Sequence, residues 1–159
     1  MKHQRKFGVL SDGRAVTEYT LRNRHGLSTG VIYATTDTQT VVNLTQHSYF
    51  NLSGDPGNTI LDHILAVNSD QVLELDDTSI LTGRILDVTN SRFDFRIPKR
   101  IAANGNGGYD NFWVLSKDLA TEWAADLRHP ESGRVLQIVT TAPGVQIYTG
   151  NAIPDGLVG

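Results

Sequence analysis

With 159 residues, the chain is long enough for one domain with a sizeable hydrophobic core. A hydrophobic content of 39% and 15 glycines are typical of a turn-rich β protein and argue against a helical bundle. The net charge of −3 argues against nucleic acid or an anionic membrane surface as the main partner.

The first predicted elements are short strands separated by turn residues. Residues 7–10 and 15–21 flank an Asp-Gly turn, which predicts a β-hairpin at the start of the chain. A further strand is expected to begin at 31–33. Another is expected over 40–52, where it ends at a run of turn-forming residues.

The middle of the chain is predicted to be less regular. Residues 60–76 are expected to be extended, with Ile64, Ala66 and Val72 pointing inward. Residues 79–101 contain a Thr-Gly and an Ile-Pro break and are predicted to be irregular.

The C-terminal third is again predicted to form short strands. A short apolar strand is expected at 112–115. A hairpin is predicted from strands 122–128 and 134–141, joined by turn residues that begin at His129, and a last strand from 145–149. No segment has a convincing apolar period of 3.6 residues, so the chain is predicted to be an all-β sandwich or barrel.

The segment 40–52 carries an unusual row of polar side chains. Because side chains alternate across a strand, polar and apolar residues would occupy opposite faces. Such a row is typical of a strand that lines a polar cleft. The alternative is a half-exposed strand in which His47 is an ordinary surface histidine. The residues of the polar row are Asn43, Thr45, His47, Tyr49 and Asn51.

Signals for metals, cofactors and targeting are not found in the sequence. The absence of cysteine excludes disulfides, thiol catalysis and cysteine-based metal sites. The five histidines show no zinc-binding spacing, so no metal and no cofactor is predicted, and His3, His25, His63 and His129 are interpreted as surface or structural residues. No apolar run follows the basic residues 2–6, so we expect no signal peptide, no membrane span and a cytoplasmic protein.

The stretch Asn-Leu-Thr-Gln-His-Ser-Tyr-Phe-Asn-Leu at 43–52 resembles the signature of the aldose 1-epimerase (galactose mutarotase) family. Further stretches resemble family motifs in the same order: 91–96 its Phe-Asp-Phe-Arg segment, 108–112 its Gly-Tyr-Asp loop, and 142–151 its Pro-Gly-x-Gln-x-Tyr-Thr-Gly-Asn strand. Residues 7–28 resemble the family's opening hairpin. The resemblance implies a galactose-mutarotase-like β-sandwich.

The resemblance also predicts how the chain is organised. We expect one partial β-sandwich domain over 1–159, with an opening hairpin at 1–28 and a central part at 31–159. Compared with the family, an interior block with an Asn-Arg pair and a second active-site histidine is missing, as is the C-terminal part with the catalytic glutamate. We therefore expect the chain to be poorly stable alone or to associate with another chain through exposed sheet edges.

By resemblance, the reaction is the interconversion of the α and β anomers of a free hexose, galactose or glucose. His47 is the general acid that protonates the ring oxygen, because an imidazole exchanges protons near neutrality. Sugar contacts are expected from His47, Ser48, Tyr49, Asp110 and Gln146. Without the resemblance, Asp110 is a turn aspartate and Gln146 an outward strand residue, and Ser48 points away from His47 if the strand is regular.

Two alternative functions remain open. Because the family's glutamate is missing, the acid has no partner base, and the chain is alternatively a catalytically dead carbohydrate-binding remnant. A sugar-phosphate epimerase-like protein is the other alternative, although the net negative charge offers no obvious phosphate clamp. In each case the partner is a sugar.

Overall fold

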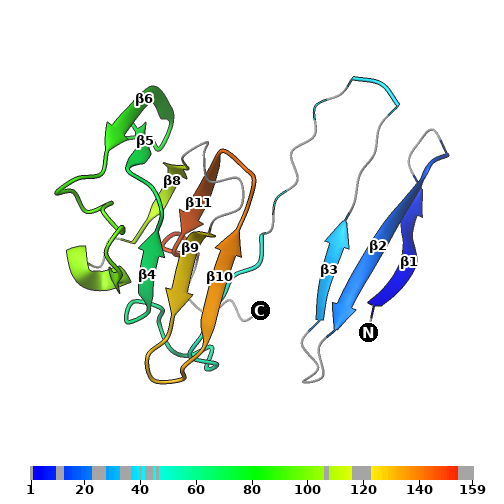
Figure 1. Ribbon diagram of the computed structural model, residues 1–159, viewed down its shortest axis with the longest axis horizontal. Helices are drawn as coiled ribbons and strands as arrows, with labels where there is room; N and C mark the ends of the chain where they lie inside the picture. Colours follow the sequence, from blue (N-terminus) through cyan, green and yellow to red (C-terminus); the bar gives the residue numbers. More distant parts are fainter. Residues whose placement is uncertain are drawn as a thin grey trace. The chain divides into compact units, whose positions relative to one another are not determined.

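The computed structural model describes residues 2–9, 13–22, 28–32, 37–39, 41, 45, 47–105, 108–115 and 123–153. The chain divides into two compact units, Met1–His47 and Ser48–Gly159 (Figure 1). The prediction of a single domain stays a prediction. Predicted positions that lie outside the described residues include Asp12, His25, Tyr33, Asn43 and Glu122.

The first unit contains a three-stranded antiparallel sheet in the order β1-β2-β3. Its strands are β1 (Lys2–Val9), β2 (Ala15–Arg22) and β3 (Ser28–Ile32). The predicted opening hairpin is confirmed, because Lys2 pairs with Leu21 and Val9 with Ala15. Gly13 has a φ of 89° in the connecting turn, a conformation that glycine adopts without the steric penalty of a side chain.

The second unit contains two four-stranded antiparallel sheets, which confirms the all-β prediction (Figure 1). One sheet has the order β10-β9-β4-β7, with β10 (Val135–Val139), β9 (Trp123–Arg128), β4 (Ile64–Val67) and β7 (Lys99–Arg100). The other has the order β11-β8-β5-β6, with β11 (Gly144–Tyr148), β8 (Asp110–Val114), β5 (Gln71–Leu75) and β6 (Leu81–Asp87). A short 3-10 helix, η1 (Ile101–Asn104), follows β7.

The hydrophobic core of the second unit combines side chains from both of its sheets. Val67 of β4, Val72 of β5 and Trp113 of β8 are each 0% exposed and belong to one cluster. Trp113 also satisfies its indole N–H by donating a 3.0 Å hydrogen bond from Nε1 to the carbonyl of Phe93. Burying each such side chain contributes roughly 1.5–3 kcal/mol, so this cluster holds the two sheets together.

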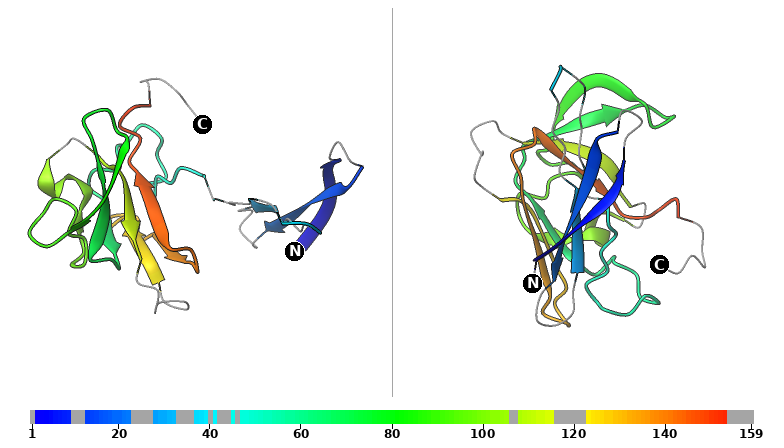
Figure 2. Two further views of the ribbon diagram at one scale, coloured as in Figure 1. Left: turned by 90° about the horizontal axis from the view of Figure 1, so that it is seen from above. Right: turned by 90° about the vertical axis from the view of Figure 1, so that its right-hand side faces the viewer.

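The hairpin predicted in the C-terminal third is also confirmed. In Figure 2, β9 and β10 (yellow and orange) run side by side, and Val135 pairs with Arg128. The connecting turn is closed by hydrogen bonds from the amide of Gly133 to the carbonyl of His129 and from the amide of His129 to the carbonyl of Arg134. His129 is therefore a turn residue, as predicted.

The strand predicted over 40–52 is wrong for the part of it that the structure describes. Val41, Thr45 and residues 47–50 lie outside strands, and a turn begins at Leu52. A strand forms only where a neighbouring strand satisfies its backbone N–H and C=O groups. Sequence alternation predicts which side chains would share a face, but it carries no information about the partner.

Two further predictions need correction. Residues 79–101 were expected to be irregular, but they contain β6 and β7. The side chains of β6 are mostly exposed, so this edge strand lacks an apolar alternation and depends on pairing with β5. In 60–76, Ala66 and Val72 are buried as predicted, but Ile64 is only half-buried.

Among the described residues, no helix is long and apolar enough to cross a membrane.

Candidate active site

Two of the predicted sugar-binding residues meet on the outward face of β8 and β11. Asp110 is the first residue of β8 and lies directly opposite Tyr148 of β11, while Gln146 lies opposite Phe112. Nε2 of Gln146 donates a 2.8 Å hydrogen bond to Oδ1 of Asp110. Both side chains are exposed to solvent. The pair therefore presents a carboxylate and an amide, fixed relative to each other, on one surface of the sheet.

An aromatic ring lies next to this polar pair because Gly144 has no side chain. A Cβ atom placed on Gly144 would overlap the ring of Phe112 and would lie 2.5 Å from the carbonyl oxygen of Trp113. A backbone carbonyl cannot move aside as a flexible side chain can. Glycine at 144 therefore lets the Phe112 ring cross from β8 over β11, beside Gln146.

Tyr49 packs against the same strand, although it is far from β11 in the sequence. Its ring and that of Tyr148 are 6.1 Å apart between centroids, in an edge-to-face arrangement with an interplanar angle of 69°. The hydroxyl oxygen of Tyr148 accepts a 3.0 Å hydrogen bond from the amide of Ala152, which orients its ring. Tyr49 is 59% exposed, so most of its side chain remains accessible to a ligand.

The structure thus brings together Tyr49, Asp110 and Gln146, and it adds Tyr148. Tyr148 had no predicted role, although the period of two along β11 places it on the same face as Gln146. Ser48 directly precedes Tyr49 and is exposed. His47 is also exposed, but it is the last residue of the first unit, whereas the other predicted site residues belong to the second. The assignment of these residues to catalysis and sugar binding stays a prediction.

The charged motif residues at 91–96 form a structural network. Nε and Nη2 of Arg96 donate to the Asp94 carboxylate at 2.8 and 2.7 Å, and Nη1 donates to Asp70 at 2.9 Å. The Arg96 hydrogen bonds lower the pKa of Asp94 to about 2. Tyr109 donates from its hydroxyl to the carbonyl of Arg92 at 3.1 Å. The Tyr109 bond therefore ties the residue directly before Asp110 and β8 to this segment.

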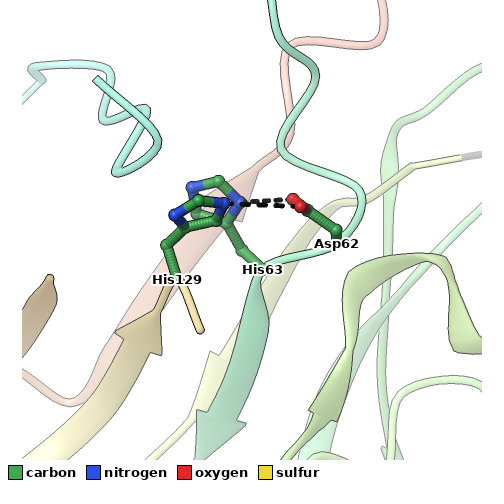
Figure 3. A group of neighbouring side chains, drawn as sticks. All are labelled: Asp62, His63 and His129. Atoms are coloured by element: carbon green, nitrogen blue, oxygen red, sulfur yellow. Dashed lines mark hydrogen bonds and ion pairs between the residues drawn. The ribbon is translucent and has the colours of Figure 1, made fainter. Parts of the chain in front are cut away.

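A second cluster of chemically active side chains lies in the second unit, formed by Asp62, His63 and His129 (Figure 3). Nδ1 of His63 lies 2.9 Å from Oδ1 of Asp62, and Nε2 of His129 lies 3.4 Å from Oδ2. His63 is 0% exposed and His129 5% exposed, so both are structural rather than surface histidines. The hydrogen bond from His63 is the main cause of the lowered pKa of Asp62. No local sequence pattern connects 129 to 62–63, so this cluster was not predicted.

The second unit is thus a β-sandwich whose outward face carries a polar and aromatic candidate ligand site. Comparisons with known proteins agree with the predicted family. The model of the family described as aldose 1-epimerase matches residues 8–157. The chain belongs to the aldose 1-epimerase family.

Individual relatives support this assignment. The chain is 40% identical over 124 residues to the galactose mutarotases of Sus scrofa and Homo sapiens; each alignment covers 76% of this chain and 36% of the relative. It is 32% identical over 152 residues to the aldose 1-epimerase of Escherichia coli (strain K12), covering 86% of this chain and 42% of the relative. The chain therefore spans less than half the length of these relatives.

A solved structure supports the fold. The GalM/aldose epimerase homologue from C. elegans superimposes with a TM-score of 0.59 at 22% sequence identity. The match covers 87% of this chain and 43% of that structure. The galactose-mutarotase-like β-sandwich predicted from the sequence is therefore confirmed as the fold.

Proposed function

We propose that this chain carries part of the sugar site of an aldose 1-epimerase that interconverts the α and β anomers of a free hexose such as galactose or glucose. The observation that carries the proposal is the hydrogen-bonded Asp110–Gln146 pair, which lies on the same exposed face as the Tyr49–Tyr148 ring contact. Membership of the family and the names of the relatives support the reaction type.

The Asp110–Gln146 pair is suited to binding sugar hydroxyls. The bond between them uses one carboxylate oxygen and one amide N–H. The second carboxylate oxygen can accept a hydrogen bond from a hydroxyl, and the amide carbonyl of Gln146 can accept another. The rings of Tyr49 and Tyr148 add apolar surface, against which the C–H face of a pyranose can pack.

The proposed chemistry is ring opening by a general acid and a general base. The ring oxygen gains a proton as its bond to the anomeric carbon breaks, and the anomeric hydroxyl loses one. We assign the acid to His47. By resemblance the base is a glutamate, and no carboxylate of the 159 residues lies in a motif that marks it as that base. We therefore expect the chain alone to bind sugar but to turn it over slowly, which is also what a non-catalytic binding remnant would do.

The first experiment is a binding and turnover assay on the chain and on matched variants. Galactose binding is measured by isothermal titration, and the approach of α-D-galactose to anomeric equilibrium by polarimetry. We expect saturable binding that Asp110→Ala weakens, by roughly tenfold or more for a hydrogen-bonded pair. The control is Glu131→Gln, which changes an exposed carboxylate in the β9–β10 turn. Equal binding by all three proteins would contradict the proposed site.

The turnover arm separates the enzyme from the binding remnant. If the chain accelerates mutarotation and His47→Ala abolishes this acceleration, the general acid acts within this sequence. No acceleration together with saturable binding would favour the binding function. Tighter binding of galactose 6-phosphate than of galactose would favour the sugar-phosphate alternative and contradict the assignment to free hexoses.

A further inference from the structure

Leu52, which closes the motif 43–52, is held by side chains at both of its backbone groups. Its N–H donates a 2.9 Å hydrogen bond to Nε2 of His63. Its carbonyl oxygen accepts from Oγ of Ser132 at 2.7 Å and from Nη1 of Arg134 at 3.0 Å. Side chains from two other parts of the chain therefore satisfy both backbone groups of this turn residue. Leu52 follows closely on Ser48 and Tyr49, so these bonds anchor the end of that segment within the second unit.

These contacts determine which nitrogen of each imidazole carries the proton. Nε2 of His63 accepts from Leu52, so the proton is on Nδ1 and is donated to Oδ1 of Asp62. Nδ1 of His129 accepts a 3.1 Å hydrogen bond from the amide of Ser132, so its proton is on Nε2, which faces Oδ2 of Asp62. One carboxylate therefore accepts the N–H of His63 in a hydrogen bond and faces the N–H of His129 at 3.4 Å (Figure 3), and in this arrangement each ring carries a single proton.

The same contacts argue against a metal ion in this cluster, although its ligand atoms lie within 4.8 Å of one another. A metal would replace both ring protons. A neutral metal-bound imidazole carries its one proton on the nitrogen that does not bind the metal. In His63 and His129 that second nitrogen accepts a hydrogen bond from a backbone N–H, so it has no place for the proton. Metal-bound histidines instead donate their second N–H to an acceptor. The cluster is built to hold two protons.

From this geometry we infer that Asp62, His63 and His129 form a proton-sensitive clamp that positions the Ser48–Leu52 segment, and with it Tyr49, through the backbone of Leu52. The part of the inference that concerns sugar rests on the proposed function. A second proton on His63 would place its Nε2–H against the N–H of Leu52, and one on His129 would oppose the N–H of Ser132. Each replaces a hydrogen bond by a donor–donor contact, so the clamp opens as the pH falls.

The other charged groups near the clamp do not account for its expected response to pH. Arg100 of β7 and Arg128 of β9 are register partners of Ile64, next to His63 in the chain. Arg128 is paired with Asp126 at 2.8 Å, and Arg134 lies in the turn with His129. The exposed carboxylates in the adjoining loops are Asp55, which follows Leu52, and Glu131, in the β9–β10 turn.

The arginines stay charged across the whole pH range in which histidines titrate. The pKa of Asp62 is lowered, mainly by the hydrogen bond from His63, so its carboxylate stays ionised at pH values where a free aspartate would begin to take up a proton. Between about pH 8 and 5, only the histidines ordinarily change charge.

The first test uses the full chain and needs no activity. Long-range proton–nitrogen NMR spectra at about pH 7.5 report the protonated nitrogen of each histidine. We expect Nδ1–H for His63 and Nε2–H for His129. We also expect the Leu52 amide to be protected from hydrogen exchange, relative to the intrinsic rate at each pH, and to lose that protection as the pH falls to about 5. The opposite tautomers, or a zinc titration that shifts both rings and raises the melting temperature, would overturn the inference.

Matched variants then test the positioning role. His63→Gln keeps an acceptor for Leu52 but has no imidazole to protonate, whereas His63→Leu has no acceptor. We expect His63→Gln to keep most of the Leu52 protection at both pH values, and His63→Leu to lose roughly tenfold or more of it at neutral pH. Asp70→Asn, at an exposed ion pair with Arg96, is the control. Retained protection in His63→Leu would overturn the clamp.

The sugar arm distinguishes failure of the clamp from failure of the proposed function. If the wild-type chain binds galactose, His63→Leu should weaken that binding several-fold at neutral pH, and acid should weaken wild-type binding more than binding to His63→Gln. Unchanged binding in His63→Leu, with Leu52 exchange increased, would overturn the link to the site. No galactose binding by any variant would contradict the proposed function, and the Leu52 exchange data would decide the clamp.

Discussion

Gln146 on β11 donates a 2.8 Å hydrogen bond to Asp110 on β8, across the two strands and on their exposed face. The contact joins residues from two stretches, 108–112 and 142–151, that resemble separate motifs of the aldose 1-epimerase family. It also fixes the orientation of the Gln146 amide, because Nε2 must face the carboxylate. The carbonyl of that amide is then oriented as an acceptor, and this supports a site that recognises hydroxyl groups.

Replacing Gln146 by glutamate should make this pair dependent on pH. Two carboxylates at hydrogen-bond distance cannot both be ionised without repulsion, so the pKa of one of them should rise. A raised carboxyl pKa in the folded state stabilises the fold below that pKa, and the contribution is lost as the pH rises through it. We expect Gln146→Glu to lower the melting temperature more at pH 7 than at about pH 4.

Gln146→Met removes the hydrogen bond without adding charge and is the control for this experiment. Its effect should be the same at both pH values. Carbon-detected NMR titration of Asp110 measures the coupling directly. An unchanged Asp110 titration in Gln146→Glu would mean that the two side chains are not in contact in solution.

Adding one methyl group at Gly144 should destabilise the second unit. The new Cβ would overlap the Phe112 ring and approach the Trp113 carbonyl to 2.5 Å. Overpacking of this kind costs about 1–3 kcal/mol. Urea unfolding of Gly144→Ala measures the loss. Gly8→Ala is the control, because nothing lies within 4 Å of the Cβ position there.

A second substitution tests the cause. Phe112→Ala in the Gly144→Ala background removes the ring contact but leaves the Trp113 carbonyl in place. It should therefore relieve only part of the overpacking in a double-mutant cycle. Strictly additive effects of the two substitutions would show that the ring of Phe112 does not cross Gly144.

Trp113→Phe should be strongly destabilising. The indole is 0% exposed and donates a 3.0 Å hydrogen bond to the carbonyl of Phe93. Phenylalanine is smaller and has no N–H, so the substitution leaves a cavity and an unsatisfied carbonyl. We expect a loss of about 2–4 kcal/mol in the free energy of unfolding. Trp123→Phe, at a half-buried position, should cost less, and equal losses would contradict the assignment of Trp113 to the centre of the core.

The Arg96–Asp94 contact should support the fold above acidic pH only. Hydrogen bonds from Arg96 lower the pKa of Asp94 to about 2, from the usual aspartate value of about 3.8. A lowered carboxyl pKa contributes stability above the unfolded value, and this is lost as the pH falls through the folded value. Arg96→Gln should therefore lower the melting temperature at pH 7 but have little effect near pH 2. Arg14→Gln, at an exposed pair with Asp37, should have little effect at either pH.

Self-association through sheet edges stays a prediction, and β10 offers a place to test it. Among the described strands, β10 lies at the edge of its sheet, and Val135 and Val139 are 57% and 60% exposed. Lysine at an exposed edge disfavours pairing with another chain. We expect Val139→Lys to reduce any concentration-dependent association in sedimentation equilibrium. Ile97→Lys, at an 80% exposed residue outside the strands, should leave it unchanged.

The sequence alone predicted the opening hairpin, the β9–β10 hairpin and β11, because alternation and turn chemistry act between neighbouring residues. Its motifs also identified the family. The sequence did not predict β6, which has no buried face and exists because β5 pairs with it. It predicted a strand at 47–50 where the described residues form none. Local pattern does not encode whether a strand finds a neighbour.

The candidate site, like the fold, was predicted only in part from the sequence. Asp110 and Gln146 could be predicted singly, because each lies in a motif, but their hydrogen bond depends on the register of β8 against β11. The contact of Tyr49 with Tyr148 and the meeting of Asp62 with His129 join residues that are distant in the chain. Such contacts form only when the core closes, so the sequence determined which groups are available and the tertiary structure decided which of them meet.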